Sequence, residues 1–304
     1  MNDEFPGVER QPGDGHIVDT GEAFATRARI HQTYSAPAHD LCAWALERIQ
    51  WRGDEVVLDA ACGAGAYLDA LRARVPGGQL VAADCALDLL DARGAGGAVA
   101  IAPRLRHMVS ALPFANDTFD VVLAAHILDY VADIDAALSE LHRVLRPDGA
   151  VMVVTHSNSH MAEFDVLYCH ACALLGVPED EVSASRPRRP FRVERAASLL
   201  SRHFFAVARY DLPSMLIFPE VAPAMRFLES LRPAREPSLP AGVTWPMLMR
   251  VMAELIAQVI DYFGALMVSK LSAVLVATDA SDFAAPFAAW AGSKAHSGRF
   301  TLPA

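Results

Sequence analysis

A short apolar strand followed by a glycine-rich turn constrains this 304-residue chain more than any other feature of it. Residues 57–66 read Val-Leu-Asp-Ala-Ala-Cys-Gly-Ala-Gly-Ala, and apolar residues recur at helical spacing from Leu68 onward. The pattern predicts a strand, a turn and a helix in that order. Gly63 and Gly65 would lie in the turn, where missing side chains let a ligand approach the backbone. Asp59 would stand at the strand end, beside that ligand.

Two kinds of nucleotide site use such a turn, and the third position of the motif separates them. A dinucleotide-binding turn has the spacing G-x-G-x-x-G, in which the last glycine lets the helix pack tightly on the strand. Leu68 occupies that position here. The sequence therefore disfavours an NAD-type oxidoreductase and favours another cofactor that contains a nucleoside.

Three further segments extend the pattern in a fixed order. Residues 79–84 form a second apolar strand that ends in Asp84, where a carboxylate can hold both hydroxyls of a ribose. Residues 112–122 read LPFANDTFDVV and lead into another strand. Residues 141–150 read LHRVLRPDGA and turn into the next one. Strands that alternate with helices in this way predict a parallel sheet with helices on both faces.

In this order, the four segments resemble the motifs of the class I S-adenosylmethionine (SAM)-dependent methyltransferases. The resemblance covers about residues 24–278 and is strong over residues 55–155. It implies an α/β fold with a Rossmann-like, seven-stranded, mostly parallel sheet whose last strand is antiparallel. It also implies N-terminal helices and a helical insertion that acts as a cap. The chain departs from the family at Ala61, which stands where the motif usually has its first glycine.

The same resemblance assigns the residues that bind SAM and its product S-adenosylhomocysteine. They are Asp59, Ala61, Cys62, Gly63, Gly65, Asp84, Cys85, Met108, Val109 and His126. The acid that commonly binds the adenine amino group falls at Met108, so that side-chain contact is expected to be absent. We expect backbone groups at Val109 and apolar packing against Met108 and Cys85 to hold the adenine instead.

Four side chains are candidates for a catalytic role. A sulfonium methyl is already activated, so transfer depends mainly on in-line positioning and on excluding water, while a protonated acceptor also benefits from a base. The candidates are His126 after the fourth strand, His156 and His160 after the fifth, and Tyr34 near the N-terminus. An imidazole titrates near neutral pH and suits a base. A structural role is the alternative for each, and no metal site is expected.

The remaining chain divides by its glycines, prolines and apolar periods. We expect a flexible tail at 1–20, a methyltransferase domain at 21–278 with its core at 50–160, a helical cap at about 213–264 and a C-terminal extension at 279–304. Expected helices lie at 24–29, 40–50, 161–175, 193–204, 222–231 and 245–262, strands at 206–212 and 273–278, and a linker at 176–190. Apolar helices of the insertion would either join two subunits into a homodimer or close one active site.

Two local clusters each have two interpretations. Five arginines lie close together in an otherwise acidic chain: Arg186, Arg188, Arg189, Arg192 and Arg195. They indicate either an anion site for a phosphate, a carboxylate or an acidic carrier protein, or a solvated linker. Cys169 and Cys172 have the spacing of a ligand pair, but no second pair completes four zinc ligands, so we expect them to pack inside an apolar helix.

Bulk properties exclude several kinds of partner. The formal net charge of −10 argues against a nucleic-acid substrate, because phosphate contacts need a basic face. No uncharged apolar run reaches about 18 residues, and the N-terminus has no signal-peptide pattern, so we expect a cytoplasmic protein without a membrane partner.

The sequence therefore predicts an enzyme that transfers methyl from SAM to the oxygen, nitrogen or carbon of a small, largely apolar molecule, such as a product of secondary metabolism. One alternative is a carrier-bound or carboxylate acceptor, which the arginines would favour. An alternative of another class is a regulator or scaffold that binds SAM or S-adenosylhomocysteine without catalysis, because a fold does not fix a function.

Overall fold

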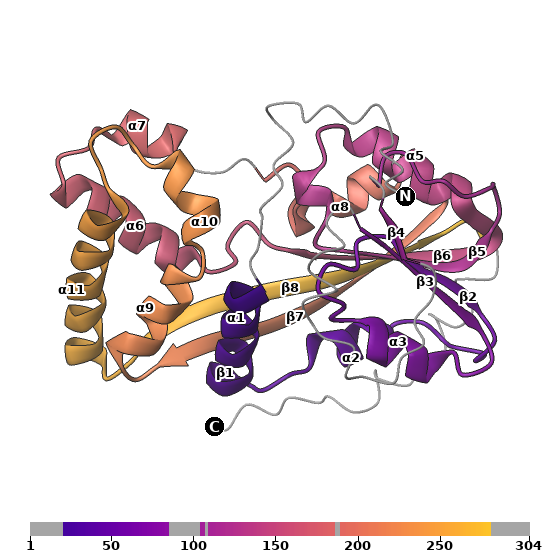
Figure 1. Cartoon of the computed structure of the whole chain (residues 1–304), viewed down its shortest axis with the longest axis horizontal. Coiled ribbons are helices and arrows are strands. Elements are labelled where there is room, and N and C mark those ends of the chain that lie inside the picture. Colours follow the sequence, from indigo (N-terminus) through magenta and orange to yellow (C-terminus); the bar gives the residue numbers. More distant parts are fainter. Residues whose placement is uncertain (1–20, 85–103, 107–108, 186–188, 281–304) are drawn as a thin grey trace, which may run out of the picture.

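A single eight-stranded sheet forms the centre of the molecule (Figure 1). The computed structural model describes residues 21–84, 104–106, 109–185 and 189–280. The strand order is β1-β7-β8-β6-β5-β2-β3-β4. The strands are β1 (Ser35–Ala36), β2 (Val56–Asp59), β3 (Gln79–Asp84), β4 (Arg104–Arg106), β5 (Phe119–Ala125), β6 (Leu145–His156), β7 (Ala206–Phe218) and β8 (Leu266–Thr278).

Strand directions confirm the expected mostly parallel sheet with an antiparallel last strand. Strands β2 to β6 pair in parallel, and β8 runs antiparallel to both of its neighbours, β6 and β7. The sequence did not predict β1, a two-residue strand that pairs antiparallel with β7 and makes the eighth member of the sheet.

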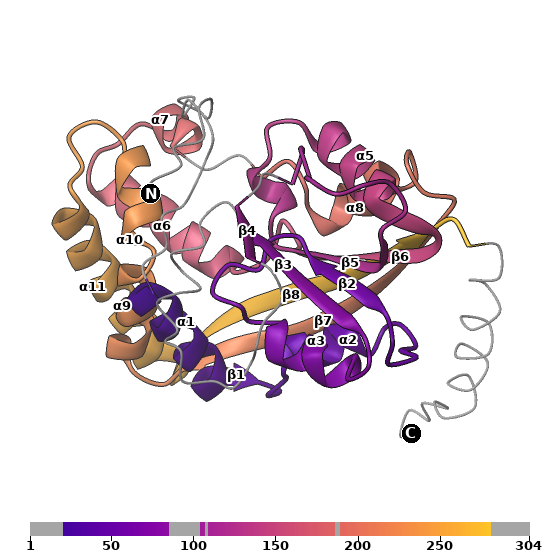
Figure 2. The ribbon, with the colours of Figure 1, turned by 45° about the vertical axis from the view of Figure 1, so that its right-hand side comes forward.

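Helices cover both faces of the sheet because the central strands are apolar on both sides. On one face, Leu58 and Val122 pack with α5 (Ile134–Val144) and α8 (Val193–Leu200). On the other, Val57 and Leu123 pack with α2 (Leu41–Leu46) and α3 (Leu68–Arg74). Figure 2 shows the two layers above and below the strands. The N-terminal helix α1 (Gly21–Tyr34) is longer than the predicted helix, and α2 is shorter.

Side-chain caps fix where several helices begin. Asp40 accepts a hydrogen bond of 3.0 Å from the backbone N–H of Ala43 at the start of α2, and Asp133 accepts one of 3.0 Å from Ala136 at the start of α5. Such caps satisfy backbone donors that have no partner inside the helix. They set the ends of the helices that flank the central strands.

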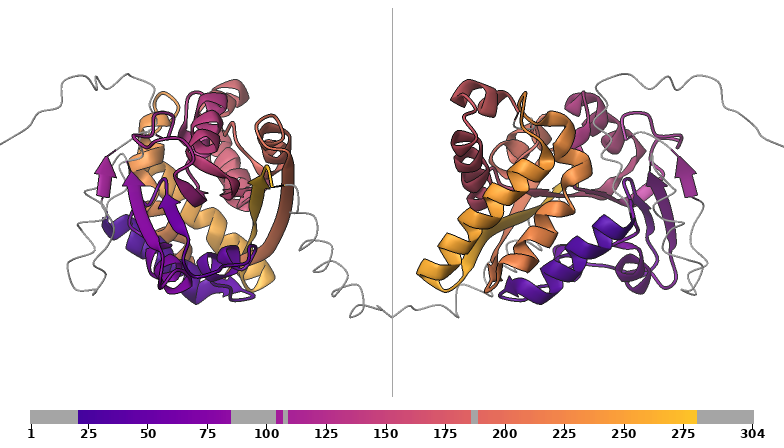
Figure 3. Two further views of the ribbon diagram at one scale, coloured as in Figure 1. Left: turned by 90° about the vertical axis from the view of Figure 1, so that its right-hand side faces the viewer. Right: turned by 60° about the vertical axis from the view of Figure 1, so that its left-hand side comes forward.

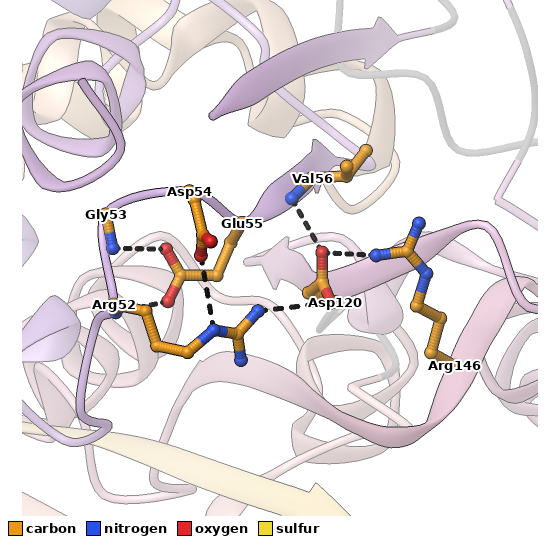
Figure 4. Close-up of polar contacts among 7 residues, drawn as sticks. All are labelled: Arg52, Gly53, Asp54, Glu55, Val56, Asp120 and Arg146. Carbon is orange, nitrogen blue, oxygen red and sulfur yellow. Dashed lines mark hydrogen bonds and ion pairs between the residues drawn. The ribbon is translucent and has the colours of Figure 1, made fainter. Parts of the chain in front are cut away.

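A polar network ties β2 to β5 and β6 at the amino end of the sheet (Figure 4). Asp120 accepts a hydrogen bond of 2.8 Å from the backbone N–H of Val56 and one of 2.6 Å from Arg146. Burial acts to raise the pKa of Asp120, but these two donors outweigh it and lower the pKa overall. Glu55 is buried and accepts a hydrogen bond from the backbone of Arg52 at 2.5 Å. The network lies at the edge opposite the carboxyl ends of the strands, so its role is to fix strand register.

Strands β7 and β8 continue past the sheet as a two-stranded ribbon. They pair over their full 13 residues, from Ala206 opposite Thr278 to Phe218 opposite Leu266. Pairing of β6 with β8 stops at His156 opposite Ser272. The predicted strand ends, at 212 and 273, were therefore wrong. Pro213 does not end β7, because the structure pairs it only with β8 and a proline is tolerated where the other strand edge is unpaired.

The ribbon carries a group of helices that we call the helical unit. It consists of α6 (Ala162–Leu174), α7 (Glu179–Ala184), α9 (Val221–Glu229), α10 (Arg232–Arg235) and α11 (Trp245–Phe263). This unit and α1 share one apolar cluster with the ribbon residues Leu216, Phe218 and Val268. Figures 1 and 2 show the unit at one end of the sheet, and Figure 3 shows α11 along its outer side. Part of the expected linker at 176–190 is helical, because α7 lies within it.

The sequence placed the cap at about 213–264, and that division of the chain stays a prediction. In the structure, residues 213–218 belong to β7, while α6 and α7 pack with the later helices. No helix in the described ranges is long and apolar enough to cross a membrane.

Candidate active site

The turn after β2 is held to both neighbouring strands by its backbone. The N–H of Ala60 donates to the carbonyl of Leu123 in β5 at 2.9 Å, and the N–H of Cys62 donates to Ala83 in β3 at 3.0 Å. Gly63 then takes a φ of 49°, in the left-handed region that favours glycine. A Cβ built on Gly63 would meet no atom within 4 Å, so the turn leaves open space where a ligand could approach.

Two carboxylates border this turn. Asp84 accepts a hydrogen bond of 2.8 Å from the N–H of Gly63, which ties the end of β3 to the turn. Asp59, at the end of β2, is only 1% exposed, and burial raises its pKa to about 7. The backbone of Ala61 opposes this rise, and the charge of Asp84 adds to it. A cationic ligand group beside Asp59 would favour the ionised carboxylate and lower that pKa.

Buried polar atoms without a hydrogen-bond partner concentrate around the same edge of the sheet. Within the described ranges they are both carboxylate oxygens of Asp59, the Tyr67 hydroxyl, His126 Nδ1 and Arg192 Nε. The Tyr67 hydroxyl lies near the Cys42 thiol and Asp59. An unsatisfied buried polar group costs about 1–3 kcal/mol, so several of them in one region indicate a place for a polar ligand.

His126 has a strained backbone at the end of β5. Its φ of 59° is rare for a residue other than glycine, and its N–H donates to the carbonyl of Val154 in β6 at 2.9 Å. Such strain of about 1–3 kcal/mol is typical of functional sites. The conformation brings the His126 ring against that of His156, with centroids 4.5 Å apart.

Three histidines form a stack at this place. The rings of His156 and His160 lie 3.8 Å apart at an angle of 22°, which extends the pair formed by His126 and His156. His156 Nδ1 lies 3.1 Å from the Ser272 hydroxyl, and His160 Nδ1 donates to the carbonyl of Leu271 at 3.3 Å. The stack therefore contacts β8 through Ser272 and Leu271. Three of the four predicted catalytic residues, His126, His156 and His160, lie together in it.

Burial keeps the stacked imidazoles neutral. It lowers the pKa of His126 to about 4, with a further contribution from the charge of Arg192. It lowers the pKa of His160 to about 3, although the Leu271 carbonyl opposes the shift, and it holds the pKa of His156 well below its ordinary value. At neutral pH each ring is therefore uncharged and can accept a hydrogen bond, although the lowered pKa makes it a weaker base than a free imidazole.

Two neighbours of the stack were not among the predicted site residues. Lys270 donates to His31 Nδ1 at 3.2 Å and to the Ser35 hydroxyl at 2.8 Å. Burial lowers the pKa of Lys270 to about 8, and burial together with Lys270 lowers the pKa of His31 to about 4. Lys270 is the charged residue of β8, and this was the sequence signal for the pair. Tyr34, the fourth catalytic candidate, packs against the Phe218 ring with centroids 5.4 Å apart.

The arginine cluster contributes one buried side chain to this region. Arg192 is 6% exposed and pairs with Asp129 at 3.1 Å, so the solvated-linker interpretation is wrong for Arg192. Asp129 also accepts a hydrogen bond of 3.2 Å from the N–H of Phe191. Arg189 is half-buried and Arg195 is exposed. Arg186 and Arg188 lie outside the described residues.

Other predicted residues are placed as follows. Cys62 and Val109 are buried, and Ala61 and Gly63 are half-buried beside the turn. Cys85 and Met108 lie outside the described residues, so their assignment to the adenine stays a prediction. Cys169 and Cys172 lie on α6 within the apolar cluster of the helical unit.

Known proteins match this chain in the residues that form the core of the sheet. Residues 58–153 match the family model described as methyltransferase domain. A malonyl-[acyl-carrier protein] O-methyltransferase of Methylovorus is 31% identical over 47% of this chain and 52% of its own length. A demethylmenaquinone methyltransferase of Mycolicibacterium paratuberculosis is 37% identical over 37% of this chain and 46% of its own length. The chain thus spans about half the length of these curated relatives.

Solved structures share the fold. A candidate methyltransferase of Bacillus halodurans superposes with a TM-score of 0.55 at 18% identity, over 79% of this chain and 99% of its own. The YcgJ protein of Bacillus subtilis gives a TM-score of 0.52 at 16% identity, over 79% and 98%. Residues 58–153 therefore resemble the methyltransferase domain family in sequence, and the chain shares the fold of these two solved structures.

Proposed function

We propose that this protein is an enzyme that transfers the methyl group of SAM to a small, largely apolar acceptor. The observation that carries the proposal is the set of unpartnered buried polar atoms of Asp59 and His126, at the carboxyl ends of adjacent strands. Ligands of open parallel sheets bind at this edge. The Asp59 oxygens would face the cofactor, and His126 Nδ1 would face the acceptor.

The turn and the two carboxylates form the cofactor side of the proposed site. Gly63 leaves room for the ligand, Asp84 would accept from ribose hydroxyls while it holds the turn, and ionised Asp59 would face a cationic or hydrogen-bond-donating group. Backbone groups at Val109 are proposed to contact the adenine. Bound SAM would supply an activated sulfonium methyl.

The histidine stack forms the acceptor side. His126 Nδ1 would accept a hydrogen bond from an acceptor O–H or N–H, because this buried atom has no partner among the described residues and the ring is neutral. His156 and His160 stack behind it and restrict how the His126 ring can turn. The helical unit and α1 would exclude water from the transfer.

The proposal is tested by product formation. The purified protein is incubated with SAM and a pool of small aromatic and polyketide-like molecules, and mass spectrometry follows gains of one methyl group. We expect S-adenosylhomocysteine to form in proportion to a methylated product. Binding of S-adenosylhomocysteine without any product from a broad pool would instead support the regulator or scaffold alternative.

The His126→Gln variant tests the role of the imidazole, with His170→Gln as the matched control because His170 is exposed on α6. For an acceptor that starts protonated, we expect the His126 change to lower kcat by about 10²-fold, the lower end of the usual contribution of a general base, because its lowered pKa makes the imidazole a weaker base. The control should keep the wild-type rate. An unchanged rate in His126→Gln would exclude the proton role.

A carboxylate acceptor, free or carrier-bound, is a second candidate favoured by the buried Arg192, whose Nε has no partner among the described residues. One relative of this chain is named a malonyl-[acyl-carrier protein] O-methyltransferase. A carboxylate is already ionised and would need no base. Arg192→Ala should then raise the KM for a malonyl thioester on its carrier at least about tenfold, as expected for the loss of a charge-assisted contact, whereas exposed Arg195→Ala should not. Equal KM values for both variants would remove this candidate.

A cytoplasmic location, a place in secondary metabolism and a homodimer formed through the helical unit stay predictions from the sequence. Sedimentation of the purified chain at several concentrations distinguishes a homodimer from a monomer.

A further inference from the structure

A pocket lies inside the helical unit, apart from the turn after β2. It has a volume of about 520 Å³, counting the space at its open mouth. Its lining includes Phe164 and Tyr168 of α6, Leu228 of α9, and Trp245 and Leu248 of α11. A concave site with a mainly apolar wall and a few polar groups is typical of a small-molecule site.

The polar groups around this pocket have partners within the protein. Arg235 pairs with Asp165 at 3.4 Å, the Tyr168 hydroxyl lies 2.8 Å from that of Ser185, and the Trp245 indole donates to Glu229 at 2.7 Å. An uncharged apolar group could enter without breaking these contacts, whereas a charged group would find its counter-charges already paired. The chemistry of the wall therefore selects an aliphatic chain or an aromatic ring.

Aromatic contacts connect the pocket wall to the histidine region. The Phe164 ring stacks on Phe227 with centroids 5.5 Å apart, and Phe227 meets the edge of His31 at 5.8 Å. Helix α6 begins two residues after His160. At a rise of about 1.5 Å per residue, Phe164 and Tyr168 lie roughly 3 and 9 Å along α6 from its first residue, Ala162. One elongated molecule could reach both places.

We propose that this pocket binds the apolar part of the methyl acceptor, while the reacting end of the acceptor lies at the histidine stack. The proposal rests on the proposed function and narrows it to acceptors that carry an alkyl chain or a ring at one end and the methylated atom at the other.

A neutral fluorescent probe tests the pocket by itself. N-phenyl-1-naphthylamine should bind the wild-type protein at one equivalent. Met249→Trp, which adds a ring to the pocket wall, should weaken probe binding at least tenfold. Met247→Trp is the matched control, because Met247 lies on the same helix, is 37% exposed and is not part of the lining. Failure of the wild-type protein to bind one equivalent, or equal weakening in both variants, would overturn the pocket assignment.

A series of 4-n-alkylphenols tests the class of ligand. Their competition with the probe should strengthen about threefold to fourfold for each added methylene, which is the expected effect of burying that group, until the pocket is full. An affinity that does not change with the length of the alkyl chain would contradict a site for an apolar group.

Histidine ring signals in NMR spectra test the link to the acceptor side. Addition of 4-octylphenol should shift the ring signals of His31 and His160, each assigned with its His→Gln variant, in the wild-type protein but not in Met249→Trp. Binding at the pocket without a shift of either signal would overturn the acceptor assignment. The same samples are also titrated with S-adenosylhomocysteine. Loss of cofactor binding would count against the proposed function, whereas cofactor binding without a histidine shift would count against the acceptor assignment alone.

Discussion

Asp59 is a buried carboxylate that the protein alone stabilises poorly. Its side chain is 1% exposed without a hydrogen-bond partner in the described ranges, and its pKa rises to about 7. In the unfolded chain an aspartate titrates near 3.9. The folded state therefore holds the proton more tightly. The folded protein therefore becomes less stable as the pH rises from about 4 to about 7, compared with a variant that has an uncharged residue in place of Asp59.

Asp59→Asn should stabilise the ligand-free protein at pH 8. The three-unit difference corresponds to at most about 4 kcal/mol in the free energy of unfolding, and about half of that gain should remain at pH 5.5. Urea denaturation at both pH values measures the effect, with exposed Asp69→Asn on α3 as control. No gain at pH 8 would contradict the buried, unsatisfied state of Asp59.

The histidines have the opposite dependence on pH. Their pKa values in the folded protein lie near 4 for His126 and near 3 for His160, whereas an unfolded histidine titrates near 6.5. Each histidine contributes full stability above pH 6.5, and this contribution is lost as the pH falls toward the folded value.

His160→Gln should reduce the loss of stability on acidification. Between pH 7.5 and pH 5, the wild-type protein should lose about 2 kcal/mol per buried histidine, and the variant should lose about 2 kcal/mol less than the wild type. Exposed His170→Gln should leave the pH profile unchanged. Parallel profiles for wild type and His160→Gln, measured by urea denaturation, would contradict the assigned burial of the stack.

At the scale of elements, local patterns predicted the central strands and their turns. The apolar run before Asp59 and the glycines after it are contiguous in sequence. The start of β6 requires Gly149, because a Cβ there would lie 2.7 Å from the carbonyl oxygen of Asp120. The extension of β7 could not be predicted in this way. The side chains of β7 beyond residue 212 pack with a helical unit that is assembled from distant segments of the chain. In addition, a proline such as Pro213 usually indicates the end of a strand, although here it pairs with Leu271.

The network at the amino end of β2 should matter for stability but not for ligands. Asp120→Asn removes a carboxylate that accepts from Arg146 at 2.6 Å, and we expect a loss of about 1–3 kcal/mol in the free energy of unfolding. Asp54→Asn is the control, because its exposed pair with Arg52 should contribute less than about 1 kcal/mol (Figure 4). Equal effects of the two changes would contradict the role assigned to Asp120.

At the scale of the whole molecule, the ribbon joins two apolar clusters. One lies between the sheet and helices such as α5 and α8, and the other lies within the helical unit. The sequence predicted His126, His156 and His160 as site residues because they lie at or just after the carboxyl ends of β5 and β6. It missed Lys270 and His31, because their contact joins β8 to α1 across 239 positions of the chain.

Calorimetric titration with S-adenosylhomocysteine tests whether the turn after β2 binds the cofactor. We expect one bound equivalent for the wild-type protein. Asp84→Ala should weaken that binding by about 1–3 kcal/mol, because the ribose hydroxyls lose an acceptor, while exposed Asp69→Ala should bind like the wild type. Thermal unfolding of each variant checks that it is folded. No binding by the wild type, or full affinity in Asp84→Ala, would contradict the cofactor site at the carboxyl ends of β2 and β3.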